Sequence, residues 1–220
     1  MSFTNKKCAV FDLDGTLIDT ITDLRNACEA VMNNHGFKAE YTDDDYKRFV
    51  GNGIRKLVDR AFRESLDAET LDLYLSEFLE YYSAHSLDNT RPYSGISEQL
   101  KLLKERGIKM CVITNKAEPA AVNIIEKLFG EGVFDLIVGQ RDGLPTKPAP
   151  DGVRLALKEL GFTPDEALYF GDSNVDMQTA INAGVDAVGV LWGFRSYGEL
   201  SQYKPACLIN NPDEISGLFK

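Results

Sequence analysis

The chain has 220 residues, of which 44% are hydrophobic, and it carries 24 basic and 34 acidic side chains for a formal charge of −10. This length fits one or two domains with enough apolar residues for a core. The acidic balance argues against nonspecific nucleic-acid binding, which requires a basic surface. The sequence shows neither a leader pattern nor an apolar stretch of 18 residues, so we expect a cytoplasmic protein with no membrane partner.

The first predicted strand, 8–11, is apolar and leads directly into two aspartates, Asp12 and Asp14. Like charges this close raise the free energy unless a cation lies between them. In open α/β sheets, ligands bind beyond the carboxyl ends of the strands. We therefore interpret Asp12 as a nucleophile or metal ligand and Asp14 as its acid/base partner. A simple helix cap or solvated turn is the alternative for this motif.

Between residues 17 and 88 strand signals are absent and apolar residues recur at helical spacing, which predicts a compact helical insertion. We expect three helices, within 21–31, 54–61 and 71–82. An insertion of this length is typical of a cap that closes over substrate and excludes water, and a long crossover is the alternative. It contains Gly51, Asn52 and Gly53, which either join two helices or contact substrate.

Two later apolar runs, 109–113 and 167–170, have the pattern of buried parallel strands in βαβ units. Polar residues follow each run: Thr114 and Asn115 the first, Asp172 and Asp176 the second. Because parallel strands end at the same edge of a sheet, we expect Asp12, Thr114 and Asp172 to converge.

These residue types support phosphoryl transfer through an aspartyl-phosphate. Asp12 would attack phosphorus, while Asp14 would protonate the leaving oxygen and later activate water. Asp12 and Asp172 offer oxygen ligands suited to Mg²⁺, and Asp176 would bind the metal through water or orient Asp172. Thr114 would donate its hydroxyl to the phosphate, together with backbone N–H groups of the following helix.

A lysine is expected to offset charge on the phosphoryl oxygens. Lys147 has prolines on both sides that stiffen its loop, so we prefer it to Lys116, although an ordinary exposed loop lysine is the alternative. We place Asn115 with Thr114 among the phosphate-binding residues.

Together, Asp12-x-Asp14-Gly15-Thr16, Thr114-Asn115, Lys147 and Gly171-Asp172-Ser173-x-x-Asp176 resemble the four motifs of the haloacid dehalogenase superfamily, in order. The resemblance implies a Rossmann-like α/β core with a parallel sheet over 1–16 and 89–220, and a small α-helical cap domain over 17–88. It also implies a Mg²⁺ cofactor, with the backbone carbonyl of Asp14 as a further metal ligand, and phosphatase activity. The second aspartate marks phosphotransferases of this superfamily rather than dehalogenases.

The helical insertion and Gly51, Asn52 and Gly53 resemble the phosphoglycolate phosphatase subgroup, in which a similar segment faces the active site. This resemblance implies a phosphomonoester phosphatase acting on a small phosphorylated metabolite such as 2-phosphoglycolate. A sugar-phosphate mutase, a pyrophosphatase and a noncatalytic protein that binds phosphate or accepts a phosphoryl group are the alternatives. Either a monomer or a homodimer is compatible with the sequence.

Overall fold

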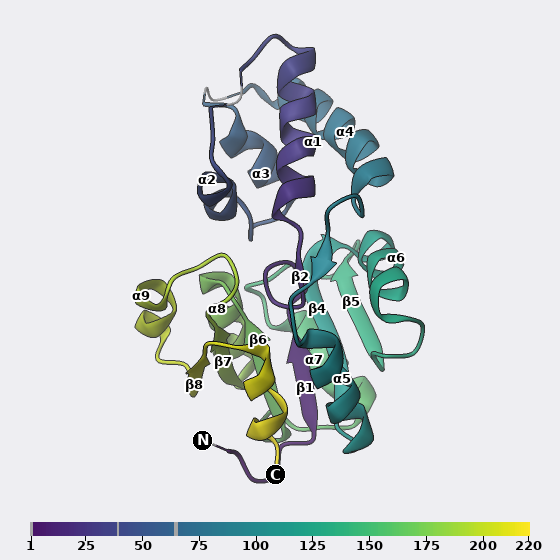
Figure 1. Cartoon of the computed structure of the whole chain (residues 1–220), viewed down its shortest axis with the longest axis vertical. Coiled ribbons are helices and arrows are strands. Elements are labelled where there is room, and N and C mark those ends of the chain that lie inside the picture. The colour runs from purple at the N-terminus through teal and green to yellow at the C-terminus, as the bar shows by residue number, and fades with distance from the viewer. Residues whose placement is uncertain (1, 39, 64–65) are drawn as a thin grey trace. The chain divides into compact units, whose positions relative to one another are not determined.

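The computed structural model describes residues 2–38, 40–63 and 66–220. The chain divides into two compact units (Figure 1). The sheet unit comprises Met1–Ile18 and Pro92–Lys220, and the helical unit comprises Asp19–Arg91. The chain passes between them at two short strands that pair with each other, β2 (Ile18–Asp19) and β3 (Arg91–Pro92).

The sheet unit is built on six strands in the order β5-β4-β1-β6-β7-β8, and every neighbouring pair is parallel. The strands are β1 (Cys8–Phe11), β4 (Lys109–Ala117), β5 (Leu136–Gln140), β6 (Ala167–Gly171), β7 (Asp186–Val190) and β8 (Cys207–Ile209). The predicted α/β class with a parallel sheet is therefore confirmed. The run expected to end at residue 113 continues as β4 to Ala117, with a shift of register between Ile113 and Ala117.

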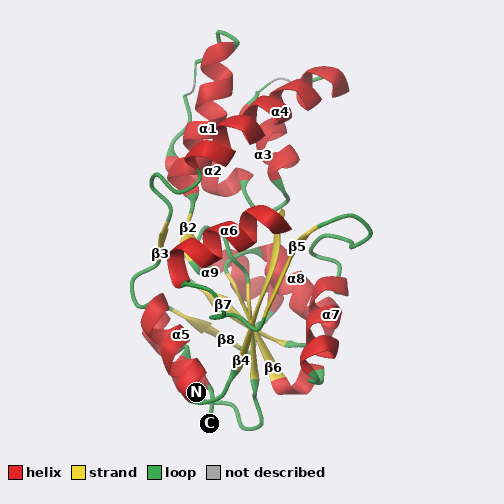
Figure 2. Ribbon diagram, turned by 90° about the vertical axis from the view of Figure 1, so that its right-hand side faces the viewer, coloured by secondary structure: helices red, strands yellow, loops and turns green. Residues whose placement is uncertain are grey.

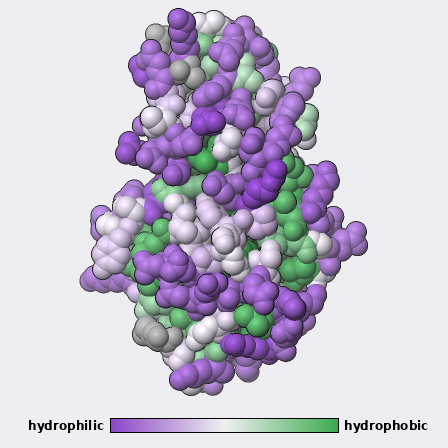
Figure 3. Space-filling view, in the orientation of Figure 1, coloured by the Kyte–Doolittle hydropathy of each residue, from purple (hydrophilic) through white to green (hydrophobic). Residues whose placement is uncertain are grey.

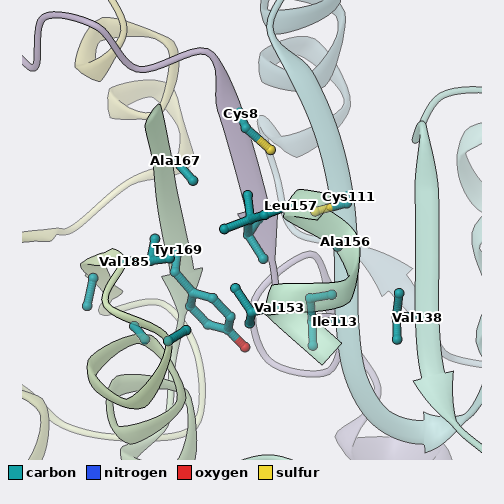
Figure 4. Packing of buried hydrophobic residues seen from close by; sticks show 14 of the residues in the cluster. Cys8, Cys111, Ile113, Val138, Val153, Ala156, Leu157, Ala167, Tyr169 and Val185 are labelled. Carbon is teal, nitrogen blue, oxygen red and sulfur yellow. The ribbon is translucent and has the colours of Figure 1, made fainter. Parts of the chain in front are cut away.

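Helices cover both faces of this sheet (Figure 2). They are α5 (Ile96–Glu105), α6 (Glu118–Phe129), α7 (Asp151–Leu160), α8 (Asn174–Ala183) and α9 (Tyr197–Leu200), with 3₁₀ turns at Pro164–Glu166, Ser201–Tyr203, Pro212–Glu214 and Ser216–Leu218. Side chains alternate along β1, so that Cys8 and Val10 join the cluster under α7 and α8 (Figure 4), whereas Phe11 stacks on Phe170 at 4.9 Å between ring centroids.

The order of the strands determines where the sheet unit can bind a ligand. From β1 the chain moves to β4 and β5 on one side, then returns to β6, β7 and β8 on the other. Such a reversal opens a crevice at the carboxyl ends of the central strands. The ends of β1, β4 and β6 are therefore the place to look for a site.

The helical unit consists of α1 (Ile21–Asn34), α2 (Asp43–Phe49), α3 (Ile54–Ala61) and α4 (Ala68–His85). Thr42 forms a capping box with Asp45 at the start of α2, and Asp67 caps α4. Near the two ends of the unit, the buried Asp23 carboxylate accepts the backbone N–H groups of Asn89 and Thr90 at 2.8–3.0 Å. Burial alone would raise the pKa of Asp23, but hydrogen bonds from the side chains of Asn89 and Thr90, together with these backbone bonds, lower it.

Hydrophilic side chains cover much of the face seen in Figure 3. Across the three described stretches, no helix combines the length and apolar character that membrane crossing demands.

Candidate active site

Asp12 lies at the carboxyl end of the central strand β1 and is buried. Its backbone N–H donates to the carbonyl of Phe170 at 2.9 Å, which ties it to the neighbouring strand β6. Its Oδ1 accepts the Leu13 N–H and lies 2.7 Å from Lys147 Nζ. Burial raises the pKa of Asp12 well above its usual range, and the charge of Asp176 adds to this rise while Lys147 opposes it.

Lys147 reaches this aspartate from the loop between β5 and α7, and Asn115 of β4 holds its backbone. The Asn115 Nδ2 donates to the Lys147 carbonyl at 3.1 Å, and the Lys147 N–H donates to Asn115 Oδ1 at 2.8 Å. These bonds engage the side-chain amide of Asn115, and phosphate binding by this residue stays a prediction. The Lys147 side chain is buried, whereas an ordinary loop lysine would be exposed.

Asp176 connects α8 to the same lysine. Its Oδ1 accepts from Lys147 Nζ at 2.7 Å and from the Tyr169 hydroxyl at 3.1 Å. Its Oδ2 accepts the Ser173 N–H at 3.0 Å and the Ser173 hydroxyl at 2.5 Å. The Asp176 N–H donates to Ser173 Oγ at 3.3 Å in return, which completes the capping box of α8. Both oxygens of Asp176 therefore position Lys147 and the start of the helix.

Asp172 follows β6 and is held by two donors. The Thr16 hydroxyl donates to its Oδ1 at 3.1 Å, and the Phe194 N–H donates to its Oδ2 at 2.8 Å. The Trp192 indole in turn donates to the Thr16 carbonyl at 2.9 Å. Burial, followed by the charge of Asp176, raises the pKa of Asp172 to about 7.

Gly15 allows the turn after β1 to approach Asp172 closely. A Cβ at this position would lie 2.4 Å from Asp172 Oδ2, and its φ of +88° also disfavours any residue with a side chain. Gly161 has a similar φ of +78°, but a Cβ there would meet nothing within 4 Å.

We predict that Gly15→Ala destabilises the protein far more than Gly161→Ala. The backbone strain alone costs about 1 kcal/mol in each variant, and the clash with Asp172 adds roughly 1–3 kcal/mol to the first. Urea unfolding of the two variants beside the wild type measures the difference. Equal losses would mean that Asp172 moves aside without cost.

Three buried carboxylates, those of Asp12, Asp172 and Asp176, bring oxygens within 4.8 Å of one another. One ammonium, that of Lys147, forms ion pairs with two of them. Three negative charges so close are stable only if more positive charge is added or protons are taken up, which agrees with the raised pKa values of Asp12 and Asp172. Hard oxygen donors in this arrangement fit a divalent cation.

The other predicted residues fall into two groups. Thr114 is buried within β4, close to its carboxyl end, and its Oγ1 accepts the Lys116 N–H at 3.1 Å. Asp14 Oδ1 lies 3.2 Å from Lys116 Nζ. They belong to the same unit as Asp12, Lys147 and Asp172. The remaining three, Gly51, Asn52 and Gly53, belong to the helical unit, where Asn52 Oδ1 accepts from Arg60 Nη2 at 2.9 Å.

Sequence reasoning missed the side chains that orient the aspartates. We read Tyr169 as one more apolar strand residue, although its hydroxyl binds Asp176. Thr16 belongs to the first motif, and the Trp192–Phe194 loop follows β7, but no spacing links either to Asp172. A sequence signal exists for the loop alone, because it follows the apolar run 188–191, whose strand pattern places it at the same edge of the sheet as Asp12.

Residues 9–190 match the family of haloacid dehalogenase-like hydrolases. The chain belongs to this family. It is 33% identical over 214 residues to a phosphoglycolate phosphatase of Aquifex aeolicus, with 96% of this chain and 95% of that protein covered. It is 37% identical over 217 residues to a phosphoglycolate phosphatase of Neisseria gonorrhoeae, with 96% and 89% covered. A crystal structure from Lactobacillus delbrueckii subsp. bulgaricus superimposes with a TM-score of 0.90 at 32% identity, covering 96% of this chain and 97% of that one.

Proposed function

We propose that this hydrolase is a Mg²⁺-dependent phosphomonoester phosphatase that works through an aspartyl-phosphate and prefers 2-phosphoglycolate. The observation that carries the proposal is the buried Asp12 at the end of β1, paired with Lys147 and surrounded by two further carboxylates. The relatives named phosphoglycolate phosphatase support the substrate.

The site residues of the sheet unit have distinct roles in this proposal. A carboxylate oxygen of Asp12 attacks phosphorus as the bond to the ester oxygen breaks, and Asp14 gives that oxygen a proton. Asp14 then takes a proton from the water that hydrolyses the acyl phosphate. The Thr114 hydroxyl and the Lys147 ammonium bind the phosphoryl oxygens as charge accumulates on them.

A Mg²⁺ ion would be held by Asp12, Asp172 and the backbone carbonyl of Asp14, and Asp176 would bind it through water or orient Asp172. The ion would offset the repulsion between Asp12 and an anionic phosphate. Asp172 is pre-oriented for this task because Thr16 and the Phe194 N–H fix its two oxygens. The neighbouring Lys147 remains the protein's own positive charge at the site.

We also propose that the helical insertion, predicted over 17–88, is a cap that excludes water and sets substrate choice. The junction of Gly51, Asn52 and Gly53 supports this role, because Gly51 and Gly53 have φ of +117° and +85° and Arg60 braces the loop through Asn52 and the Phe49 carbonyl. A loop fixed in this way presents its backbone groups in one arrangement.

Phosphate release from a panel of substrates tests the activity. The panel contains 2-phosphoglycolate, sugar phosphates, nucleoside monophosphates and pyrophosphate, each assayed with and without Mg²⁺. Metal-dependent release that favours 2-phosphoglycolate supports the whole proposal, and a preference for another monoester keeps the mechanism but removes the substrate. Release from pyrophosphate alone supports a pyrophosphatase, and phosphoryl transfer within a sugar phosphate without release supports a mutase.

We predict that Mg²⁺ raises the thermal midpoint more at pH 8 than at pH 6. Burial raises the pKa of Asp172 to about 7, so protons compete with the metal below that pH. Without metal, protonated Asp172 contributes stability that is fully present below the pKa of this carboxyl in the unfolded chain. That contribution is lost as pH rises through about 7, its pKa in the folded protein. Differential scanning fluorimetry with EDTA or Mg²⁺ measures both effects, and the increment should vanish in Asp172→Asn. An equal increment at both pH values would contradict the assignment of Asp172.

A further inference from the structure

Two buried lysines lie at the carboxyl ends of the strands, and each is paired with a different aspartate of the first motif. Lys147 pairs with Asp12, whereas Lys116 Nζ lies 3.2 Å from Asp14 Oδ1. The Lys116 side chain is only 3% exposed and that of Asp14 is 15% exposed. The proposed mechanism gives Lys116 no task, although burial of an ammonium is costly unless its charge is used.

The backbone of Lys116 is fixed by the residue proposed to bind phosphate. Lys116 lies in the part of β4 where the register shifts, between Ile113 and Ala117, and its N–H donates to Thr114 Oγ1 at 3.1 Å. The Lys116 side chain therefore starts from a fixed backbone beside Thr114, and its burial leaves the ammonium little freedom to move away from Asp14.

Asp14 needs such a partner more than Asp12 does. Asp12 is held by its backbone bond to Phe170 and by Leu13 and Lys147 at its carboxylate. Asp14 lies in the turn that follows, which the Gly15 N–H closes by donating to the Ile18 carbonyl at 2.9 Å. A proton donor must stay within hydrogen-bond reach of the leaving oxygen, so a freely rotating carboxylate would lose much of its effect.

We propose that Lys116 is a positioning residue for Asp14. It holds Oδ1 of the carboxylate, so that Oδ2 carries the proton that goes to the leaving oxygen. This inference rests on the proposed phosphatase function. The competing assignment is that Lys116 binds the phosphate directly, beside Thr114.

The two assignments differ in how they depend on the leaving group. An alkyl alkoxide needs the proton of Asp14, whereas p-nitrophenolate leaves with little help from a proton. Loss of a positioning residue for Asp14 therefore slows formation of the acyl phosphate from alkyl esters selectively, and kcat/KM reports this first step. Hydrolysis of the acyl phosphate, which also uses Asp14, is common to both esters and does not change the ratio of their kcat/KM values. Loss of a phosphate ligand lowers kcat/KM for both esters alike.

The test compares kcat/KM for p-nitrophenyl phosphate and for the alkyl monoester that the wild type hydrolyses fastest. We expect Lys116→Gln to lower kcat/KM for the alkyl ester by on the order of 10-fold or more, with little change in kcat/KM for the aryl ester. In Asp14→Asn the same selectivity should be larger, and adding Lys116→Gln to it should cause no further loss. Lys116→Arg, which keeps the charge, should recover part of the alkyl rate.

Lys6→Gln is the matched control, because Lys6 is also a buried lysine paired with an aspartate, Asp186, but precedes β1 at the opposite end of the strands. It should leave the ratio of alkyl to aryl rates unchanged. An unchanged ratio in Lys116→Gln, or equal losses on both esters, overturns the assignment of Lys116 while the phosphatase function stands. If Lys116→Gln does not fold, Lys116→Met removes the ammonium in its place, and an unchanged ratio in that variant overturns the assignment equally. Absence of turnover in the wild type overturns the phosphatase function and this inference with it.

Discussion

Asp12→Asn is expected to reduce phosphatase turnover by on the order of 10⁴-fold or more, because a carboxamide cannot form the acyl phosphate. The substitution should not lower the stability of the fold. Burial and the charge of Asp176 raise the pKa of Asp12, so its ionised form is a source of strain in the metal-free protein. Lys147 keeps its second partner, Asp176, in the variant. The metal-free thermal midpoint of Asp12→Asn should therefore equal or exceed that of the wild type.

Phosphate release and thermal unfolding of the same preparation check both halves of this expectation. Asp165→Asn is a suitable control, since Asp165 is exposed and lies in the turn before β6, away from the strand ends that form the site. Turnover of Asp12→Asn near the wild-type rate would rule out a covalent intermediate at this residue. A large fall in the midpoint would mean that the carboxylate stabilises the fold, against the pKa argument.

Lys147→Met is expected to cost about 3 kcal/mol of stability as well as activity. Lys147 binds Asp12 and Asp176, whose side chains are 11% and 0% exposed, so its removal leaves buried carboxylates without their counter-charge. Loss of a charge that stabilises the transferring phosphoryl group should lower kcat by roughly 10²–10³-fold. Urea unfolding and steady-state kinetics provide the two measurements.

The stability loss in Lys147→Met should depend on pH. Burial raises the pKa of Asp12 and the ammonium of Lys147 opposes that rise, so without the lysine the stability contributed by protonated Asp12 is present at low pH and lost as pH rises. The deficit relative to the wild type should therefore be larger at pH 8 than at pH 5. Lys6→Met is the control, because its partner Asp186 remains 51% exposed and hydrated, and its loss should be smaller. Equal deficits for the two variants would contradict the network around Asp176.

The sheet and the ends of its strands could be predicted because each depends on a local signal. The apolar runs at 8–11 and 167–170 are too short and too apolar for anything but buried strands, and parallel pairing then places Asp12 beside Asp172. Lys147 is located by its flanking prolines and by the family motifs, because no hydrophobic periodicity marks its position. The haloacid dehalogenase-like fold was thus accessible from sequence.

The sequence could not reveal which polar groups pair with which. The amide of Asn115 could pair with many polar groups, and only the path of the loop between β5 and α7 brings it to the backbone of Lys147. Tyr169 resembles its apolar neighbours until the position of α8 places Asp176 over its hydroxyl. Such choices depend on contacts between distant segments, and composition or spacing does not encode them.

The reciprocal bonds between Asn115 and Lys147 separate the position of the lysine from the rest of its loop. These bonds tie the backbone of Lys147 to β4, so the position of the lysine does not depend on the contacts that residues 141–146 make. Substitutions in residues 141–146 should therefore leave the positive charge of the site in place, provided that Asn115 is kept.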